Sequence, residues 1–296
     1  MDEEEKASYR KAGDIAKDVR EWSRGLVKPD AKVFDVAGQI ESRIKESGGE
    51  MAFPVNICIN DITAHYTPRA GDETKIRERD VVTIDLGVHI NGCIADTAYT
   101  MDLSGDYSGM LRANEEALSS VIESIKPGIS TGDLGEVVQS TLEDAGYKPI
   151  ENLTGHEVKQ YNLHAGISIP NVPVSYEKEI EEGMVLAIEP FATDGAGRVI
   201  ESKQAEIFSL EELRPVRMRD ARIMLNEIEK TRKALPFAAR WFSKKISPLR
   251  LNILLRDLTS QGILHKYPIL HEKEGGVVSQ FEHTLIVTED GCEVTT

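Results

Sequence analysis

The feature that most constrains the fold is a pattern of helix-breaking residues that occurs twice, 98 positions apart. The Lys-Pro pair at residues 28–29 recurs at residues 126–127, and Gly48 recurs as Gly146. The apolar positions between these breaks also match: Val36, Ile40 and Ile44 correspond to Leu134, Val138 and Leu142. Each unit is predicted to be a helix, a break, a second helix, a glycine stop and then strands. Such a repeat predicts two related halves with a shared cleft between them.

Apolar spacing of three and four residues places the helices along the chain. The first stripe contains Tyr9, Ala12, Ile15, Ala16, Val19 and Trp22, and the second contains Val33, Val36, Ile40 and Ile44. A later stripe, within residues 211–235, contains Met218, Ala221, Met224, Leu225 and Ile228. Residues 236–271 are predicted to form a small helical unit with Trp241, Ile253, Leu254 and Leu258.

The segments between these helices are rich in strand-forming residues. Residues 51–103 and 150–208 are predicted to form strands and turns, and residues 281–288 the last strand. The chain therefore divides into a main domain, residues 1–208 and 272–296, and an inserted helical subdomain, residues 209–271. Because no low-complexity linker separates them, we expect the insertion to pack on the main domain.

Composition excludes several classes of protein. The 296 residues are 40% hydrophobic and 29% charged, as in soluble globular proteins. A net charge of −15 disfavours a phosphate backbone as the main ligand, so we expect no DNA binding. Cys58, Cys93 and Cys292 show no paired spacing, which fits a reducing compartment. The charged N-terminus is no signal peptide and no apolar run could span a membrane, so we expect a cytoplasmic protein without membrane contact.

Residues 81–101 give the sharpest local signal. Asn91 and Gly92 form the preferred two-residue hairpin turn between two β-rich runs. With that turn, paired residue numbers sum to 183, so Asp96 faces Gly87 and shares a sheet face with Asp85. The two carboxylates then lie about 5–8 Å apart at Cβ. Their repulsion is relieved by a divalent cation between them, whereas the alternative is two exposed carboxylates on a solvated face.

Other strands supply further candidate ligands. His156 and His164 are eight residues apart, so in a regular strand they would face the same side, although a strand histidine is often only structural. Glu189 ends an apolar strand and Glu282 begins one, and a buried carboxylate needs a partner or a metal. Two Asp, two Glu and one His form an oxygen-rich set that suits paired divalent ions. No nucleophilic serine motif or phosphate-binding glycine loop is present.

The ordered set Asp85, Asp96, His156, Glu189 and Glu282 resembles the metal ligands of the pita-bread metallopeptidases. The local sequences that carry the resemblance are residues 64–68, 84–89, 94–96, 155–156, 163–166, 188–191 and 280–284. Together they are most similar to type 2 methionine aminopeptidases, over nearly the whole chain. The insertion also matches type 2, and the missing charged N-terminal extension matches the archaeal form.

The resemblance implies an α+β pita-bread fold, as in creatinase and aminopeptidases. Its mixed, largely antiparallel sheet has pseudo-two-fold symmetry and is covered by helices. It also implies an enzyme that removes N-terminal methionine from peptides and nascent proteins with a small second residue. The five ligands would hold two divalent ions, whether Co, Mn, Fe, Zn or Ni. The partners would be such peptides and the ribosome, and the protein would be a monomer.

The resemblance also assigns roles within the site. Glu189 would be the general base as well as a ligand, and His65 and His164 would orient substrate and stabilise the tetrahedral intermediate. The methionine pocket would be lined by Phe53, Leu163, Phe191, Tyr267 and Leu270.

Two other functions remain open at this point. One is a proline dipeptidase of the same fold, although such enzymes usually carry a further N-terminal domain. The other is a non-catalytic relative that binds partners or RNA, although such relatives typically lose metal ligands.

Overall fold

The computed structural model describes residues 1–175 and 178–296. The helices are α1 (Glu3–Ser23), α2 (Val33–Glu46), α3 (Ser108–Ser124), α4 (Thr131–Asp144), α5 (Arg219–Thr231) and α6 (Pro248–Ser260), with 3-10 turns η1 (Arg24–Leu26) and η2 (Ala239–Phe242). The strands of the first half are β1 (Glu50–Met51), β2 (Asn56–Ile59), β3 (Ile62–Ala64), β4 (Val81–Ile90) and β5 (Cys93–Asp102). Those of the middle are β6 (Lys148–Pro149), β7 (Thr154–Lys159), β8 (Asn162–Pro170), β9 (Val185–Ile188), β10 (Phe191–Thr193) and β11 (Val199–Leu210). The last are β12 (Phe237–Ala238), β13 (Leu264–Glu272), β14 (Val278–Gln280), β15 (His283–Val287) and β16 (Cys292–Val294).

Helix caps and apolar stripes explain where the helices begin and what they bury. Asp2 caps α1 by accepting a hydrogen bond from the Glu5 N–H at 2.8 Å, and Ser130 with Asp133 forms a capping box on α4. The predicted stripe of α1 is buried from Tyr9 to Val19. Trp22 is the exception: it is 40% exposed, so its assignment to the stripe was wrong.

The 98-residue repeat is confirmed by matching backbone contacts ahead of α2 and α4. The N–H of Asp30 donates to the Ile76 carbonyl at 2.9 Å, and the N–H of Gly128 donates to the Ile180 carbonyl at 2.8 Å. Asp30 and Gly128 stand 98 positions apart, and both have positive φ, 66° and 88°. The same backbone turn therefore precedes the second helix of each half.

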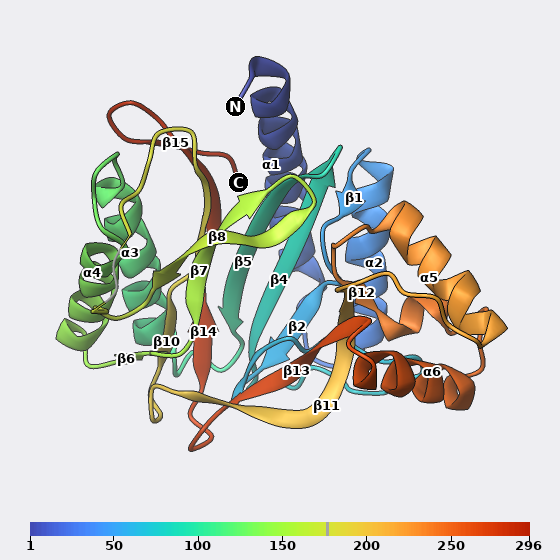
Figure 1. Cartoon of the computed structure of the whole chain (residues 1–296). Helices are drawn as coiled ribbons and strands as arrows, with labels where there is room; N and C mark the ends of the chain where they lie inside the picture. Colours follow the sequence, from blue (N-terminus) through green and yellow to red (C-terminus); the bar gives the residue numbers. More distant parts are fainter. Residues whose placement is uncertain (176–177) are drawn as a thin grey trace.

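The two halves contribute strands that meet in the middle of the molecule (Figure 1). In the first half, β4 pairs with β1, β2 and β5; in the second, the strand order is β16-β15-β9-β7-β8. The two sheets join at an antiparallel bridge between Ala98 and Glu282. All strand pairings among the described residues are antiparallel.

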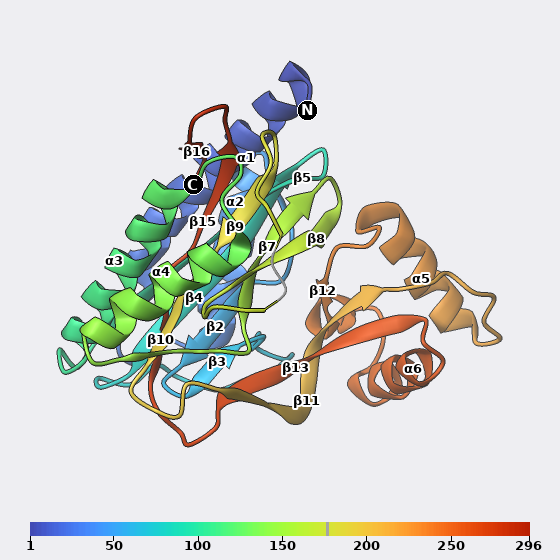
Figure 2. The same cartoon turned by 60° about the vertical axis from the view of Figure 1, so that its left-hand side comes forward.

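The two faces of this sheet have different coverings (Figure 2). Helices α1 to α4 lie on one face, and their apolar residues form the largest buried cluster with β4, β5 and β9. Strands β11 and β13 lie on the other side and lead to α5 and α6, which have a separate apolar cluster around Phe237, Leu254 and Leu258.

The insertion is less helical than the sequence predicted. Residues 264–271 belong to strand β13, whose backbone pairs with β11 on one side and with β3 on the other. Ile253 is 55% exposed on α6 and so lies outside its core. At the C-terminus, β16 follows β15 as a further strand, so residues 281–288 do not contain the last one. The division into a main domain and an inserted subdomain stays a prediction.

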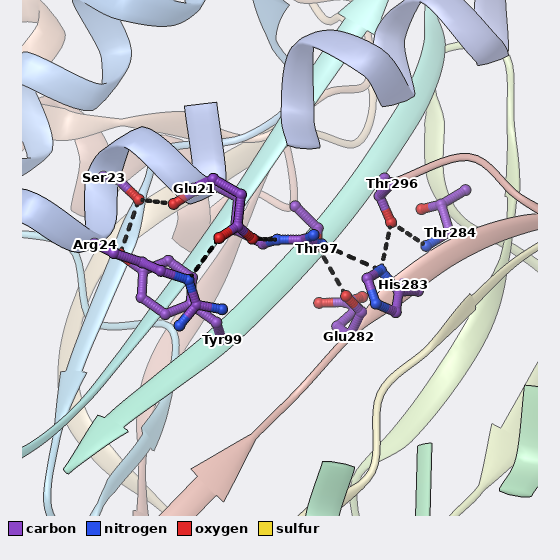
Figure 3. Close-up of polar contacts among 10 residues, drawn as sticks. Glu21, Ser23, Arg24, Thr97, Tyr99, Glu282, His283, Thr284 and Thr296 are labelled. Carbon is purple, nitrogen blue, oxygen red and sulfur yellow. Dashed lines mark hydrogen bonds and ion pairs between the residues drawn. The ribbon is translucent and has the colours of Figure 1, made fainter. Parts of the chain in front are cut away.

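Threonine hydroxyls join β5 to residues 280–284, in addition to the direct bridge. The Thr284 hydroxyl accepts from the Asp96 N–H at 2.7 Å and donates to the Asp96 carbonyl at 2.9 Å. The Thr97 hydroxyl donates to the Glu282 carbonyl at 2.8 Å, as Figure 3 shows, and accepts from Arg20 of α1. We call these contacts the threonine junction; they fix the backbones of Asp96 and Glu282 relative to each other.

Replacing Thr284→Val is expected to lower the free energy of unfolding by about 1–3 kcal/mol, because two buried backbone groups of Asp96 lose their partner. Urea denaturation measures this change. Thr259→Val is the matched control: its buried hydroxyl has no hydrogen-bond partner in the described chain, so the loss should be close to zero. Equal losses in both variants would contradict a role for the threonine junction.

Candidate metal centre

The β4–β5 hairpin positions the first two carboxylates as the sequence predicted. Gly87 pairs with Asp96 and Asp85 pairs with Ala98, and the turn residues Asn91 and Gly92 both have positive φ. On the opposite face of β4, Val82, Ile84, Leu86 and Val88 are fully buried. Asp85 and Asp96 therefore point together into one cavity.

The space left by Gly87 has a different use from the one expected. A Cβ at this position would lie 2.3 Å from Cε1 of Phe53 and 2.9 Å from Cβ of Ala52. Phe53 lines the same cavity as the carboxylates. The glycine thus makes room for an aromatic wall of the cavity rather than for a gap between the two aspartates.

The remaining predicted ligands come from the second half of the chain. His156 lies on β7, Glu189 directly follows β9, and Glu282 directly precedes β15. His156 Nε2 lies 3.8 Å from Asp96 Oδ2 and 3.5 Å from Glu189 Oε1. One ligand atom each of Asp96, His156 and Glu282 lies within 4.8 Å of the other two. All five side chains line the same cavity.

The unsatisfied polar atoms of this cluster fit a cation. Oδ1 of Asp85, Oδ1 of Asp96 and Oε1 of Glu282 are buried without a hydrogen-bond partner in the described residues. Buried carboxylate oxygens are costly unless a donor or a metal satisfies them. Hard oxygen donors with one imidazole suit divalent ions such as Mn²⁺, Co²⁺, Fe²⁺ or Zn²⁺. The donor set is therefore compatible with metal binding.

The electrostatics of the cluster lead to the same conclusion. Burial raises the pKa of Asp85 to about 7, although a hydrogen bond from Asn56 partly opposes the shift. Burial and then the neighbouring carboxylates raise the pKa values of Asp96 and Glu282 well above their usual range. Burial lowers the pKa of His156 to about 3, which leaves the ring neutral and able to bind a metal.

Three further side chains line the cavity beside the five predicted ligands. His164 contacts the His156 ring edge-on, with centroids 4.5 Å apart, and lies 6.2 Å from the Tyr267 ring. His65 lies 5.5 Å from Tyr267, and its Nδ1 lies 3.1 Å from the Pro268 carbonyl oxygen. Because that oxygen can only accept, the neutral His65 ring carries its proton on Nδ1, and Nε2 is left as an acceptor.

One step of the sequence argument about the histidines was wrong. His156 and His164 lie on the two strands of a hairpin, β7 and β8, and not on one strand, because the chain turns at Tyr161. Register shifts on either side of Glu157 set the pairing between the strands. The two rings meet all the same, across the hairpin rather than along one strand.

Most of the predicted methionine-pocket residues line the cavity. Phe53, Leu163, Phe191 and Tyr267 do so, together with Ile207 and Pro236. Leu270 does not belong to the lining; it is buried behind it, in an apolar cluster with Phe191.

Two polar residues that contact the predicted ligands were missed. The Asn56 amide donates to Asp85 Oδ2 at 3.2 Å. The Gln280 amide donates to Glu189 Oε2 at 3.2 Å and to Glu282 Oε2 at 3.3 Å. Gln280 stands two residues before Glu282 in an extended segment. Because side chains alternate between the two faces of a strand, the sequence alone could have placed both residues on the same face. No local signal marks Asn56.

Comparison with known proteins agrees with this geometry. Residues 7–289 match the model of the metallopeptidase family M24. The chain belongs to metallopeptidase family M24. Among the relatives of this M24 chain, the methionine aminopeptidase of Methanocaldococcus jannaschii is 47% identical over 96% of both chains. That of Archaeoglobus fulgidus is 44% identical over the full length of both. The resemblance to archaeal type 2 methionine aminopeptidases is thereby confirmed.

Solved structures confirm the pita-bread fold of this M24 chain. A methionine aminopeptidase from Thermotoga maritima superposes with a TM-score of 0.74 at 22% identity, and covers 100% of this chain and 98% of its own. A thermophilic Arx1 superposes with a TM-score of 0.86 at 17% identity, over 91% of its own chain. Among the described residues, none of the helices has both the length and the apolarity to cross a membrane.

The raised carboxyl pKa values predict how stability depends on pH after metal is removed with a chelator. These carboxyls hold protons in the folded chain that an unfolded chain, with pKa values near 4, has already lost. Stability should therefore fall from about pH 7 to about pH 8.5, by about 1.4 kcal/mol per pH unit for each carboxyl still protonated. The buried histidines, whose pKa values burial lowers, oppose this fall only slightly, because an unfolded histidine with a pKa near 6.5 is already mostly neutral at pH 7.

Urea denaturation at both pH values measures this dependence. Adding Mn²⁺ should remove most of the loss, and Asp85→Asn should reduce the slope. A chelated protein whose stability is constant or rises over this range would contradict the account.

Proposed function

We propose that this chain is a methionine aminopeptidase that hydrolyses the first peptide bond of substrates with N-terminal methionine and a small second residue. The observation that carries the proposal is the convergence of four carboxylates and one imidazole on the floor of a cavity with an apolar wall. We also propose that it acts as a monomer, since all five predicted ligands of the site belong to the same chain.

Asp85, Asp96, His156, Glu189 and Glu282 would hold two divalent cations, drawn from Co, Mn, Fe, Zn and Ni. When bound, the cations supply a positive field that acidifies water and polarises the substrate carbonyl. Gln280 holds the carboxylates of Glu189 and Glu282 in place by donating to both, and Asn56 does the same for Asp85.

Glu189 would act as the general base. It takes the proton of the attacking water and passes it to the leaving amine, which matches its place at the cavity floor beside His156. His164, which contacts the His156 ring, and His65, next to Tyr267, would orient the scissile carbonyl and stabilise its developing charge.

Phe53, Leu163 and Phe191 would form the methionine pocket together with Tyr267. Their apolar surfaces suit an unbranched thioether, which adapts to irregular walls. Leu270 would support this pocket from behind through Phe191.

Hydrolysis of Met-Gly-Met with each metal restored after chelation tests the proposal. Asp85→Asn should lower kcat/KM at least about 100-fold, because a ligand is lost. Glu143→Gln, which removes an exposed carboxylate on α4, is the control and should leave the rate unchanged. Faster hydrolysis of an Ala-Pro peptide than of Met-Gly-Met would favour a proline dipeptidase, and unchanged activity of Asp85→Asn would exclude the proposed centre.

The charge of the insertion supports a second proposal, contact with the ribosome. Residues 209–271 contain 13 Lys and Arg but 6 Asp and Glu, whereas the rest of the chain contains 22 and 44. Eight of these cations are exposed and form no ion pair with the described residues: Arg217, Arg219, Arg222, Lys230, Lys233, Lys244, Arg256 and Lys266. A basic unit on an acidic chain would direct the insertion towards RNA phosphates and keep the rest of the chain away.

Charge reversal tests ribosome contact. Arg219→Glu with Arg222→Glu, both on α5, should weaken co-sedimentation with ribosomes on the order of 10-fold at low salt, because two phosphate contacts are lost. Arg112→Glu with Lys148→Glu makes the same change in net charge outside the insertion and should have little effect. Tripeptide hydrolysis should be unchanged in both variants. Equal weakening by the two pairs would contradict a specific role for the insertion.

A further inference from the structure

A second pocket lies outside the metal cavity and shares no residue with it. It is formed where the β4–β5 turn and the β7–β8 turn meet the C-terminal end of α5 and one side of α1. His89 of β4 lines this pocket, and Lys11, Lys230 and Lys233 contribute the charged side chains with Glu50.

His89 carries a hydrogen-bond donor without an acceptor. The Gly92 N–H donates to His89 Nδ1 at 3.2 Å, so the proton of the neutral ring lies on Nε2. The side chain is only 4% exposed, and Nε2 has no hydrogen-bond partner in the described chain. Buried polar atoms are rarely left unpaired, so this N–H calls for an acceptor in the pocket.

The protein offers one acceptor near His89 Nε2, the Glu50 carboxylate, but it lies too far away to form a hydrogen bond. Glu50 pairs with His89 across β1 and β4, but its Oε2 lies 3.8 Å from His89 Nε2, beyond hydrogen-bond distance. The Glu50 side chain is 69% exposed. Glu50 is also the only carboxylate among the described residues that line this pocket.

The positive charges around His89 outnumber that carboxylate. Lys11, Lys230 and Lys233 form no ion pair with any described residue, and Lys233 Nζ lies 3.3 Å from the centre of the Tyr161 ring. Beside them, the buried Arg232 guanidinium donates only to backbone carbonyls, those of Met51, Ala52 and Pro236. Its charge therefore has no carboxylate in contact, in a chain whose net charge is −15.

We propose that this pocket binds a phosphate group. A phosphate offers several acceptor oxygens and up to two negative charges, so one oxygen can accept from His89 Nε2–H while others contact the lysines. The phosphate could belong to an RNA backbone or to a free anion, since Lys230 and Lys233 are part of the basic insertion. The binding chemistry is the same for both, and it does not depend on the peptidase activity.

NMR of the histidine rings during titration with inorganic phosphate tests the proposal on the intact protein. The His89 ring signals should shift in a saturable way, with a Kd in the millimolar range, about 4 kcal/mol of binding. Lys230→Ala with Lys233→Ala should weaken binding at least about 5-fold. Lys244→Ala with Lys266→Ala, exposed lysines of the same insertion that do not line the pocket, is the matched control and should change the Kd less than about 2-fold. Methionine release should be unchanged in all variants.

Two results would overturn the proposal. One is a His89 signal that responds to phosphate no more than to sodium chloride of equal ionic strength. The other is a His89 signal that shifts on Glu50→Gln substitution but not with phosphate, since Nε2 would then donate to Glu50. A short RNA serves as a second probe and distinguishes the two sources of phosphate. If RNA shifts the His89 signal, and Lys230→Ala with Lys233→Ala weakens that effect, the ligand is an RNA backbone. If inorganic phosphate shifts the signal but RNA does not, the ligand is a free anion.

Discussion

The main constraint on this structure is that four buried carboxylates, which repel one another, lie together in one cavity. Among the described residues, their close polar neighbours are the His156 imidazole and the side-chain amides of Asn56 and Gln280. Burial makes the ionised forms unfavourable and raises all four pKa values, and repulsion between carboxylates adds to the shift at Asp96, Glu189 and Glu282. A cation reverses this balance, because ionised carboxylates then become ligands. The surrounding fold must therefore hold together groups that would separate if they were free to move.

That restraint comes from both halves of the repeat. Asp85 and Asp96 stand on a hairpin of the first half, whereas Glu189 and Glu282 flank strands of the second. The threonine junction fixes the backbone of Asp96 against that of Glu282, and Arg20 of α1 supports it from the helical face. The helices α1 to α4 cover this face, which leaves the opposite one free for the cavity, with β11 and β13 at its border. The symmetry of the fold thus places the proposed ligands of the two halves in one cavity.

The sequence predicted the parts that local rules decide. The Asn-Gly turn set the register of Asp85 and Asp96, and matched breaks revealed the repeat. It failed where distant contacts decide: β13 became a strand because β11 required a partner, and Gly87 makes room for Phe53 from another segment. The net charge of −15 also concealed the basic segment at residues 209–271, because the sum over the whole chain hides a local excess of the opposite charge. The alternation of side chains along an extended segment could have identified Gln280, which stands two residues before Glu282. No local signal marked Asn56 or the hairpin that brings His156 to His164.

The most direct test of the central claim is anomalous diffraction from crystals grown with Mn²⁺. The account predicts two anomalous peaks about 3.5–4 Å apart, the spacing typical of two-metal hydrolases, both in contact with Asp85, Asp96, His156, Glu189 and Glu282 as a set. A map with no peak among these five side chains, while Mn²⁺ binds elsewhere on the protein, would contradict it.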